Sequence, residues 1–295
     1  MDSPFTIAPL ETIEQFNACE RLQLAIWESQ PGEVIPSHML ITFQRHGGLV
    51  LGAFDPEGQM IGLSIGFLGL TAPDQPLRGK ATWQHCSHEL GVVRVWRDKG
   101  VGYQLKLAQR EWVLGQGLDL ITWTYDPLEM ANAALNLGKL GAVCGCYLRN
   151  LYGAMADGLN AGLPSDRFEV AWQIRSERVR RRVSEGWNRP SLEALLGAGA
   201  VVANPAHVSA AGRVRPAPLR RLEAQSVLIE VPASFQALKM ADLGLAGEWR
   251  AHSREAFEAC FAAGYCACDV VLSETGGVRR AYYLLQNPEA ADYQA

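Results

Sequence analysis

The sequence lacks the features that mark membrane-spanning, secreted and nucleic-acid-binding proteins. No apolar run in its 295 residues approaches the roughly 18 residues that a membrane-spanning helix needs. The N-terminal stretch Met1-Asp2-Ser3-Pro4 has no basic region followed by an apolar core, so we expect no secretory signal peptide. The formal net charge of −4 argues against general nucleic-acid binding, which needs a basic face. We therefore expect a cytoplasmic protein with no membrane and no nucleic-acid partner.

Metal-ligand spacing is also lacking, although the chain has seven cysteines. Cys144/Cys146 and Cys266/Cys268 form Cys-x-Cys pairs, and no histidine lies at zinc-finger spacing from either pair. Both pairs lie in apolar stretches, where a period of two places the partners on one face of a strand. We predict reduced core thiols and no metal, with a zinc site as the alternative.

The most informative pattern in the chain is at residues 90–103, where the end of an apolar strand turns into a helix. The turn carries Arg97, Gly100 and Gly102. The first N–H groups of a helix have no internal partner and the helix dipole is positive there, so such a turn suits a phosphate. The two glycines let a phosphate approach the backbone without a Cβ in the way. The helix that follows has apolar residues at helical spacing, at positions 101, 105, 108 and 112.

This stretch resembles a known phosphate-binding element. Arg97-Asp98-Lys99-Gly100-Val101-Gly102 is similar to the Arg/Gln-x-x-Gly-x-Gly/Ala element of the GNAT acyl-CoA N-acyltransferase superfamily, and Leu90-Gly91-Val92 has the register of its lead-in. The resemblance implies that the loop holds the pyrophosphate of coenzyme A, with acetyl-CoA or succinyl-CoA as co-substrate and no metal. The implied CoA-binding residues are Leu90, Gly91, Val92, Arg97, Asp98, Lys99, Gly100, Val101, Gly102 and Tyr103.

The order of the expected elements supports the same family. We predict helices at 10–27, 37–43, 101–115 and 131–140, and strands at 49–54, 60–70, 83–92, 118–125, 143–147 and 168–174. This is the order of the GNAT fold, an α/β (α+β) fold with a mixed central sheet whose fourth and fifth strands splay apart to admit acyl-CoA. A Rossmann-type dinucleotide domain does not fit, because helices and a hairpin precede the glycine loop.

The resemblance covers roughly the first 175 residues, and composition shifts after them. We predict an acyltransferase domain at 1–175, a basic and proline-rich connecting segment at 176–225, and a small α+β segment at 226–295 with a helix at 241–263, in which Ser253 is a candidate position for a break. The basic run is interpreted as a solvated helix face, and the alternative is distributed charge that attracts the CoA 3′-phosphate or an acidic partner.

Acyl transfer to an amine needs a base, a donor for the oxyanion and help for the leaving thiolate. The family uses a backbone N–H at the end of the strand before the phosphate loop, which here points to residues 90–92. Candidate bases on that strand are His85, His88 and Glu89, and we prefer His88 over Glu89, which would act through a water. Strict alternation predicts that His88, Leu90 and Val92 share one face, and Ser87, Glu89 and Gly91 the other.

The usual general acid of the family is missing. Leu137 occupies the position of the tyrosine that the family commonly places two residues before a Lys-Leu-Gly step. Tyr147 is the phenol we name as catalytic candidate, with Tyr125 and Tyr152 as neighbours, although each also suits a packing role. A thiol pKa near 8.5 also allows the thiolate to leave unassisted.

Other polar residues suit the substrates. Asn132 and Asn136 lie one helical turn apart and could bind the pantetheine amides or cap backbone groups. A guanidinium matches a carboxylate bidentately, and the candidates for a substrate carboxylate are Arg94, Arg149 and Arg167. Asp166 beside Arg167 is equally consistent with a structural ion pair.

A finer resemblance concerns the substrate. Residues 122–128 and 159–168 resemble a poorly characterised GNAT branch linked to N-acylamino-acid (N-succinyl) metabolism. It implies a small-molecule amine, such as an amino acid, as acceptor, and we consider a homodimer as the assembly. The alternative function is a catalytically degenerate GNAT scaffold that acts as a CoA-binding or interaction module.

Overall fold

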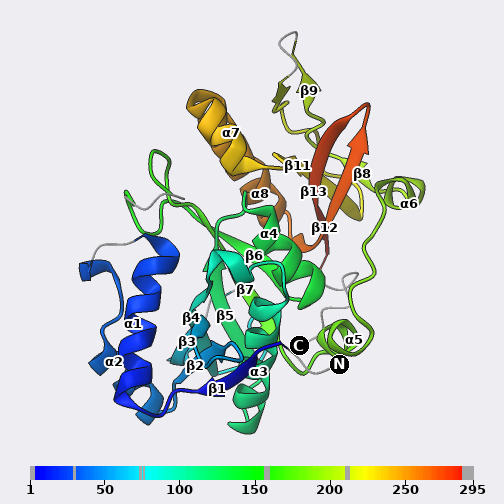
Figure 1. Cartoon of the computed structure of the whole chain (residues 1–295). Helices are drawn as coiled ribbons and strands as arrows, with labels where there is room; N and C mark the ends of the chain where they lie inside the picture. Colours follow the sequence, from blue (N-terminus) through cyan, green and yellow to red (C-terminus); the bar gives the residue numbers. More distant parts are fainter. Residues whose placement is uncertain are drawn as a thin grey trace. The chain divides into compact units, whose positions relative to one another are not determined.

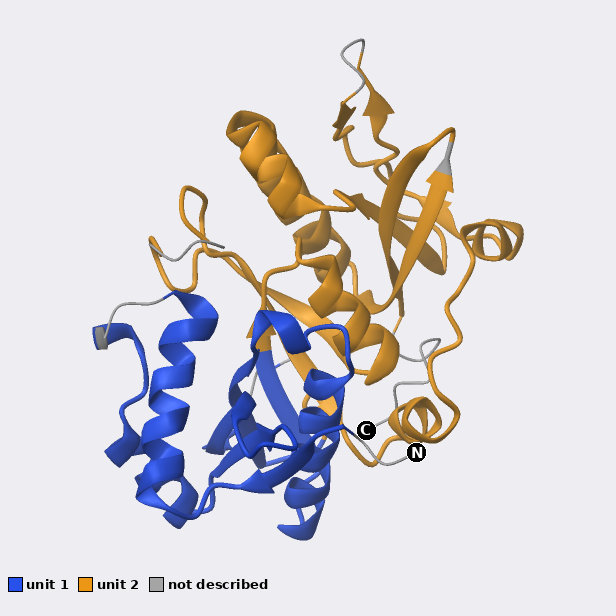
Figure 2. Ribbon diagram, viewed as in Figure 1, with its two compact units in different colours: residues 1–75, 80–123 blue, residues 76–79, 124–295 orange. Residues whose placement is uncertain are grey.

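The structure is a computed structural model that describes residues 4–28, 31–72, 75, 77–155, 160–209 and 213–287. The chain forms two compact units (Figure 2): unit 1 contains residues 1–75 and 80–123, and unit 2 contains residues 76–79 and 124–295. The predicted boundaries at residues 175 and 225 fall inside unit 2, and the predicted division into three parts stays a prediction.

Unit 1 is a mixed sheet covered by helices on both faces. Its elements are β1 (Thr6–Pro9), α1 (Ile13–Trp27), η1 (Pro31–Glu33), α2 (Ser37–Arg45), β2 (Leu49–Phe54), β3 (Met60–Leu70), β4 (Trp83–Val92), η2 (Arg94–Trp96), α3 (Val101–Gly115) and the first residues of β5 (Leu120–Tyr125). The strand order in this unit is β1-β2-β3-β4-β5. Neighbouring strands are antiparallel except for β4 and β5, which are parallel.

The two helical layers of unit 1 bury different residues of the sheet. Helices α1 and α2, which lie side by side in Figure 1, bury Phe16 and Leu40 in one core cluster with Leu63 of β3. Helix α3 buries Val101 and Leu105 in a second cluster. Because side chains alternate across a strand, the sheet contributes one set of residues to each layer. The site described below lies where β4 runs into α3.

The local signals in the sequence explain most of these elements. Thr12 and Gln15 form the predicted capping box, in which each side chain accepts from the backbone of the other. Strand β1 was not predicted, since it is four residues long and includes Pro9. It pairs only with β2, which suits an edge strand that contains a proline.

Unit 2 contains paired strands and its own helices. Its elements are α4 (Met130–Ala133), η3 (Ala134–Lys139, a π-helical turn), β6 (Val143–Leu148), β7 (Arg167–Gln173), α5 (Glu177–Glu185), α6 (Leu192–Gly197), β8 (Val201–Val202), β9 (His207–Val208), β10 (Val214–Arg215), β11 (Ser226–Val231), α7 (Phe235–Ala241), α8 (Leu243–Ala262), β12 (Cys266–Thr275) and β13 (Val278–Gln286). The strand order in this unit is β7-β6-β12-β13-β11-β8, and β9 pairs with β10.

Two predictions about unit 2 need correction. Helix α8 is continuous through Ser253, because its hydroxyl donates to the carbonyl oxygen of Arg250 at 3.1 Å and so stays within the helix. The Cys-x-Cys pairs do not follow simple alternation, because a β-bulge interrupts each of them. The pairs lie in β6 and β12, and all the cysteines are free thiols.

Within the ranges given above, no helix combines the length and the apolar character that crossing a membrane requires. In the same ranges, no group of three or more His, Cys, Asp or Glu side chains is arranged to hold a metal ion.

Candidate active site

Strands β4 and β5 diverge shortly after they meet. Their pairing consists of His85 with Ile121 and Cys86 with Thr122. Residues 87–92 of β4 therefore have no β5 partner within the part of the chain that the structure describes. On its other edge β4 stays paired with β3 as far as Val92. The divergence leaves an open edge along the second half of β4.

Backbone N–H groups face this open edge. The N–H of Val93 donates to the carbonyl oxygen of Ile61 at 3.0 Å, on the β3 side. Because backbone groups alternate between the two edges of an antiparallel strand, the N–H groups of Leu90 and Val92 face away from β3. A strand edge of this kind can pair with amides or hold a developing oxyanion.

The loop that follows has an unusual backbone. Asp98 has a φ of 61° and Gly100 a φ of 84°, both in the left-handed region. Gly100 is the N-cap of α3, and no side chain of the described residues caps this end of the helix. A Cβ added at Gly100 would meet nothing within 4 Å, and one added at Gly102 would meet Val92 and Leu90 only at 3.8 and 3.9 Å. The start of α3 is thus open to an anion.

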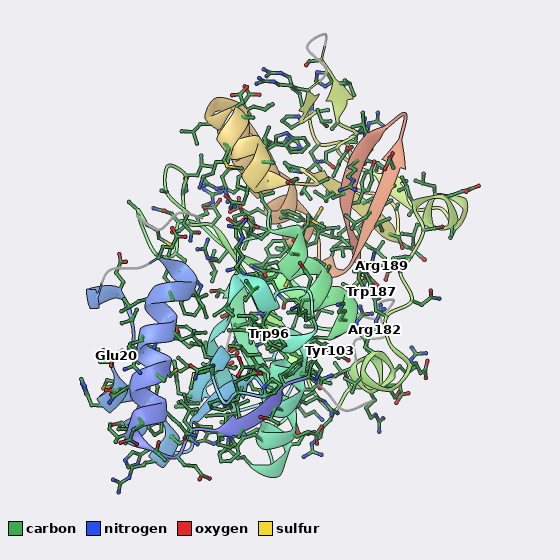
Figure 3. All side chains as sticks on the ribbon, viewed as in Figure 1. Glu20, Trp96, Tyr103, Arg182, Trp187 and Arg189 are labelled. Carbon is green, nitrogen blue, oxygen red and sulfur yellow. The ribbon has the colours of Figure 1, made fainter. Side chains whose placement is uncertain are left out.

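The side chains of Arg97 and Lys99 in this loop are exposed, and each contacts a neighbouring residue of the chain. Nε of Arg97 donates to the carbonyl oxygen of Val92 at 3.1 Å, which fixes the loop against the end of β4. Nζ of Lys99 lies 4.7 Å from the ring centroid of Trp96. Trp96 and Tyr103, labelled in Figure 3, lie before and after the glycine turn. Burial raises the pKa of Tyr103.

A β-bulge rearranges the side chains of β4. Ile65 pairs with Glu89 and Gly66 pairs with Ser87, so His88 is an extra residue in the strand. The predicted alternation is therefore wrong at this point. Glu89 and His88 lie on the α1/α2 face, where Nε2 of His88 is 3.9 Å from Oε1 of Glu89 and the ring of His88 packs on Phe67. Ser87 lies on the opposite face, beside α3.

Burial makes Glu89 the better base of the two. It raises the pKa of Glu89 to about 7, and Oε2 of Glu89 is buried without a hydrogen-bond partner among the described residues. Burial lowers the pKa of His88, whose side chain is 46% exposed. A carboxyl group that titrates near neutral pH suits general-base catalysis. The third candidate, His85, is fully buried, and burial together with Lys106 lowers its pKa to about 3.

A buried polar cluster that the sequence did not reveal lies between α3 and the sheet. Lys106, which is 2% exposed, donates to Oγ of Ser87 at 2.7 Å and to Oε1 of Gln109 at 3.2 Å. Nε2 of Gln109 donates to Oγ of Ser64 at 3.4 Å and lies 3.3 Å from Nε2 of His85. The buried side of α3 comprises residues 101, 105, 106, 109 and 113. In the sequence, this cluster could have been suspected from a lysine and a glutamine at positions on the apolar face of the predicted helix.

The candidate acid Tyr147 belongs to unit 2 and is already hydrogen-bonded. Its hydroxyl donates to Oδ2 of Asp166 at 2.7 Å, and burial with the charge of Asp166 raises its pKa. Asp166 is fully buried and also accepts from Arg254 at 2.9 and 3.0 Å. Leu137, at the usual position of the acid, is fully buried in η3.

The three candidate arginines differ in their partners. Arg149 is bound by Glu258 through two hydrogen bonds of 2.5 Å. Arg167 is buried and donates to Asn160 at 2.8 Å and to the backbone carbonyl of Asp166 at 2.9 Å, rather than to its carboxylate. Arg94, at the end of β4, is exposed, and its guanidinium forms no ion pair or hydrogen bond with the described residues.

The two asparagines of unit 2 differ in exposure. Asn132 is exposed, and Asn136 is 3% exposed in the π-helical turn. The backbone carbonyl of Asn136 accepts from the N–H of Ala142 at 3.0 Å. Their assignment to the pantetheine amides stays a prediction.

No family model matches the chain, and no curated protein matches its sequence. Among solved structures, it is similar to the ribosomal-protein-S18-alanine N-acetyltransferase of Escherichia coli, at 16% identity and a TM-score of 0.43 over 58% of this chain and 94% of that one. It is also similar to an N-acetyltransferase from Staphylococcus aureus, at 17% identity and a TM-score of 0.44 over 58% of this chain and 99% of that one. At these TM-scores the likenesses are partial.

Proposed function

We propose that this protein is an acyl-CoA-dependent N-acyltransferase. The observation that carries the proposal is that two sets of backbone N–H groups in unit 1 follow one another along the chain: those of β4 beyond its last pair with β5, and those at the uncapped N-terminus of α3. The α3 end suits the pyrophosphate of CoA, and the β4 edge suits the amides of its pantetheine arm. The thioester would then lie beside the N–H groups of Leu90 and Val92.

The reaction that fits is direct attack of an amine on the thioester. Glu89 takes a proton from the attacking ammonium, directly or through a water, and its pKa of about 7 keeps a useful fraction ionised at neutral pH. A backbone N–H of Leu90 or Val92 stabilises the oxyanion of the tetrahedral intermediate. CoA leaves as a thiolate, for which Tyr147 stays a candidate proton donor.

The acceptor we propose is the amine of a small molecule, with an amino acid as the first class to test. Its carboxylate would bind a guanidinium, and Arg94 is the candidate without a protein partner among the described residues. Acetyl and succinyl groups are the acyl groups to compare, and the resemblance to the N-succinyl branch supports including succinyl-CoA.

Binding of CoA tests the first part of the proposal. CoA is expected to raise the melting temperature of the protein, and Gly102→Trp is expected to abolish that shift by filling the start of α3. Gly115→Trp is the matched control, because Gly115 lies in the same helix with nothing within 4 Å of an added Cβ. If no CoA thioester shifts the melting temperature of the wild-type protein, the proposal is wrong.

Turnover tests the second part. Thiol release is measured with acetyl-CoA and succinyl-CoA against D- and L-amino acids and other small amines. Amine-dependent release supports the transferase. A CoA-induced shift without amine-dependent release with any acceptor would favour the alternative of a CoA-binding module.

A further inference from the structure

Lys106 lies where β4 and β5 begin to diverge. Ser87 is the first residue of β4 beyond the last pair with β5, and Trp123 is the first residue of β5 beyond the same pair. Nζ of Lys106 contacts both, at 2.7 Å from Oγ of Ser87 and 3.6 Å from the ring centroid of Trp123. One amine thus lies beside a serine hydroxyl at the point where the pairing of the two strands ends, and Ser87 is 4% exposed.

The surroundings of Lys106 suit a neutral amine. Among the described residues no carboxylate forms an ion pair with it, and it is 2% exposed. Such burial lowers the pKa of Lys106 well below its usual value. Its two other contacts, Oε1 of Gln109 and the face of Trp123, can each accept an N–H. Once the amine is neutral, its lone pair can accept the proton of Ser87 over the same 2.7 Å contact, in which the charged form donates instead.

Gln109 is held so that its oxygen faces Lys106. Its Nε2 is engaged on the other side, by Oγ of Ser64 and by Nε2 of His85. Burial keeps His85 neutral, so one ring nitrogen can accept this hydrogen bond. Gln109 is therefore a positioning residue for the amine.

We propose that Ser87 and Lys106 form a nucleophile–base pair that takes an acyl group from acyl-CoA without an amine acceptor. The inference rests on the proposed function for the presence of acyl-CoA along β4. It adds a second activity, hydrolysis of the thioester, on the α3 face of β4, whereas Glu89 serves the amine on the α1/α2 face. A serine beside an uncharged lysine is a known arrangement for nucleophilic catalysis.

The steps balance without any further reactant. Oγ of Ser87 forms a bond to the thioester carbonyl carbon while its proton passes to Nζ of Lys106. The C–S bond breaks, and the ammonium returns the proton to the leaving sulfur as CoA thiol. Water then attacks the serine ester, Lys106 transfers a proton from that water to Oγ of Ser87, and the carboxylic acid is released.

The test uses the full chain with acetyl-CoA and no amine. Rapid quench and intact-mass measurement are expected to show one acetyl group on the protein, and peptide mapping is expected to place it on Ser87 as an ester. Ser87→Ala should lose both the label and amine-independent thiol release, while amine-dependent transfer continues. Ser87→Cys should keep a label, as a thioester, which guards against a fold effect. Ser253→Ala is the matched buried-serine control and should keep the label, because Ser253 lies in α8 and its hydroxyl bonds to the carbonyl oxygen of Arg250.

Two variants of Lys106 test whether its amine acts as a base or only supplies a positive charge. Lys106→Met should slow labelling roughly 100-fold or more, the usual effect of losing a general base. Lys106→Arg, which keeps the charge but cannot accept a proton, should fail to the same degree. A Lys106→Arg variant with wild-type labelling would overturn the proposal, and so would an acetyl amide on Lys106.

The outcomes also separate this proposal from the proposed function. A protein that CoA stabilises and that transfers acyl groups to amines, but that shows no acyl-serine and no amine-independent release, refutes the Ser87–Lys106 pair alone. A protein that CoA does not stabilise, and that releases no thiol, refutes both.

Discussion

Glu89 and His88 are neighbours in the sequence, but burial moves their pKa values in opposite directions. It raises that of the carboxyl group to about 7 and lowers that of the imidazole. The cause is the same in both cases, because a low-dielectric environment disfavours whichever form is charged. The residue that we preferred from its ordinary pKa is therefore the weaker base, and the carboxyl group is poised near neutral pH.

The pH dependence of transfer follows from Glu89. For the wild-type protein, kcat/KM is expected to rise with pH through about 7 as Glu89 loses its proton. Glu89→Gln should remove that rise and lower the plateau roughly 100-fold. His88→Gln is the neighbouring control and should keep the rise. An unchanged profile in Glu89→Gln would exclude Glu89 as the base.

The same burial costs stability. The folded pKa of Glu89, about 7, lies above its ordinary value of 4.5, so the folded protein binds this proton more tightly than the unfolded chain does. Its contribution to stability is full below pH 4.5 and falls as the pH rises to about 7. The loss is at most about 3 kcal/mol. Urea denaturation of Glu89→Gln should show a gain in unfolding free energy at pH 8 and little gain at pH 4.5; equal effects at both values would contradict this assignment.

At the scale of elements, close packing of α1 on β4 depends on Gly91. A Cβ added there would meet Cδ1 of Ile26 at 2.9 Å and the ring of Trp27 at 3.0 Å, both in α1. The same glycine that resembles part of the family lead-in thus has a packing reason. It lets the helix approach the strand that carries the site.

Gly91→Ala is expected to destabilise the protein by about 1–3 kcal/mol, because the helix must shift or its side chains must leave their rotamers. Denaturant unfolding with an unchanged m-value would measure it. Gly115→Ala is the control, since an added Cβ there has no neighbour within 4 Å and alanine favours a helix. A neutral Gly91→Ala would show that α1 packs less tightly on β4 than these distances indicate.

β-bulges account for the wrong predictions of which side chains share a face of a strand. One bulge places His88 and Glu89 on the same face, and others interrupt the two Cys-x-Cys pairs. A bulge adds one residue to one strand, so it reverses the alternation beyond it without changing the apolar composition. The strand boundaries were predictable, whereas the faces past each bulge were not.

At the scale of the whole molecule, residues after 175 complete the core of unit 2. Arg250 of α8, 3% exposed, donates to both carboxylate oxygens of Asp126. Arg254 does the same to Asp166, and β12 pairs with β6. These contacts link the C-terminal residues to the segment that follows β5.

We expect a fragment of residues 1–175 to fold poorly. It would leave the buried carboxylate of Asp166 without Arg254, leave Asp126 with only the 4.0 Å pair to Arg167, and expose the β6 edge. Far-UV circular dichroism and a cooperative thermal transition check this outcome, with the full chain as reference. A fragment with a sharp transition like that of the full chain would contradict it and support an independent acyltransferase domain.

A point substitution tests the same link within the intact chain. Arg250→Met should cost about 3–5 kcal/mol, the usual effect of removing one partner of a buried ion pair, since Asp126 would keep only the 4.0 Å pair to Arg167. Arg221→Met breaks an exposed pair, in which the side chains of Arg221 and Glu223 are 87% and 66% exposed, and should change stability by less than about 1 kcal/mol. Equal effects of the two variants in urea denaturation would show that the Asp126–Arg250 pair adds nothing.

The sequence by itself determined the order of the elements and the glycine turn at residues 97–102. Local rules specify both, since periodicity sets helices and strands, and left-handed turns and an open helix start favour glycine. Only the tertiary structure decided which face of β4 carries Glu89, and that Tyr147, Arg149 and Arg167 have protein partners. It also brought Lys106 to Ser87 and Trp123. Burial and pairing between distant segments set these features, and no local spacing encodes them.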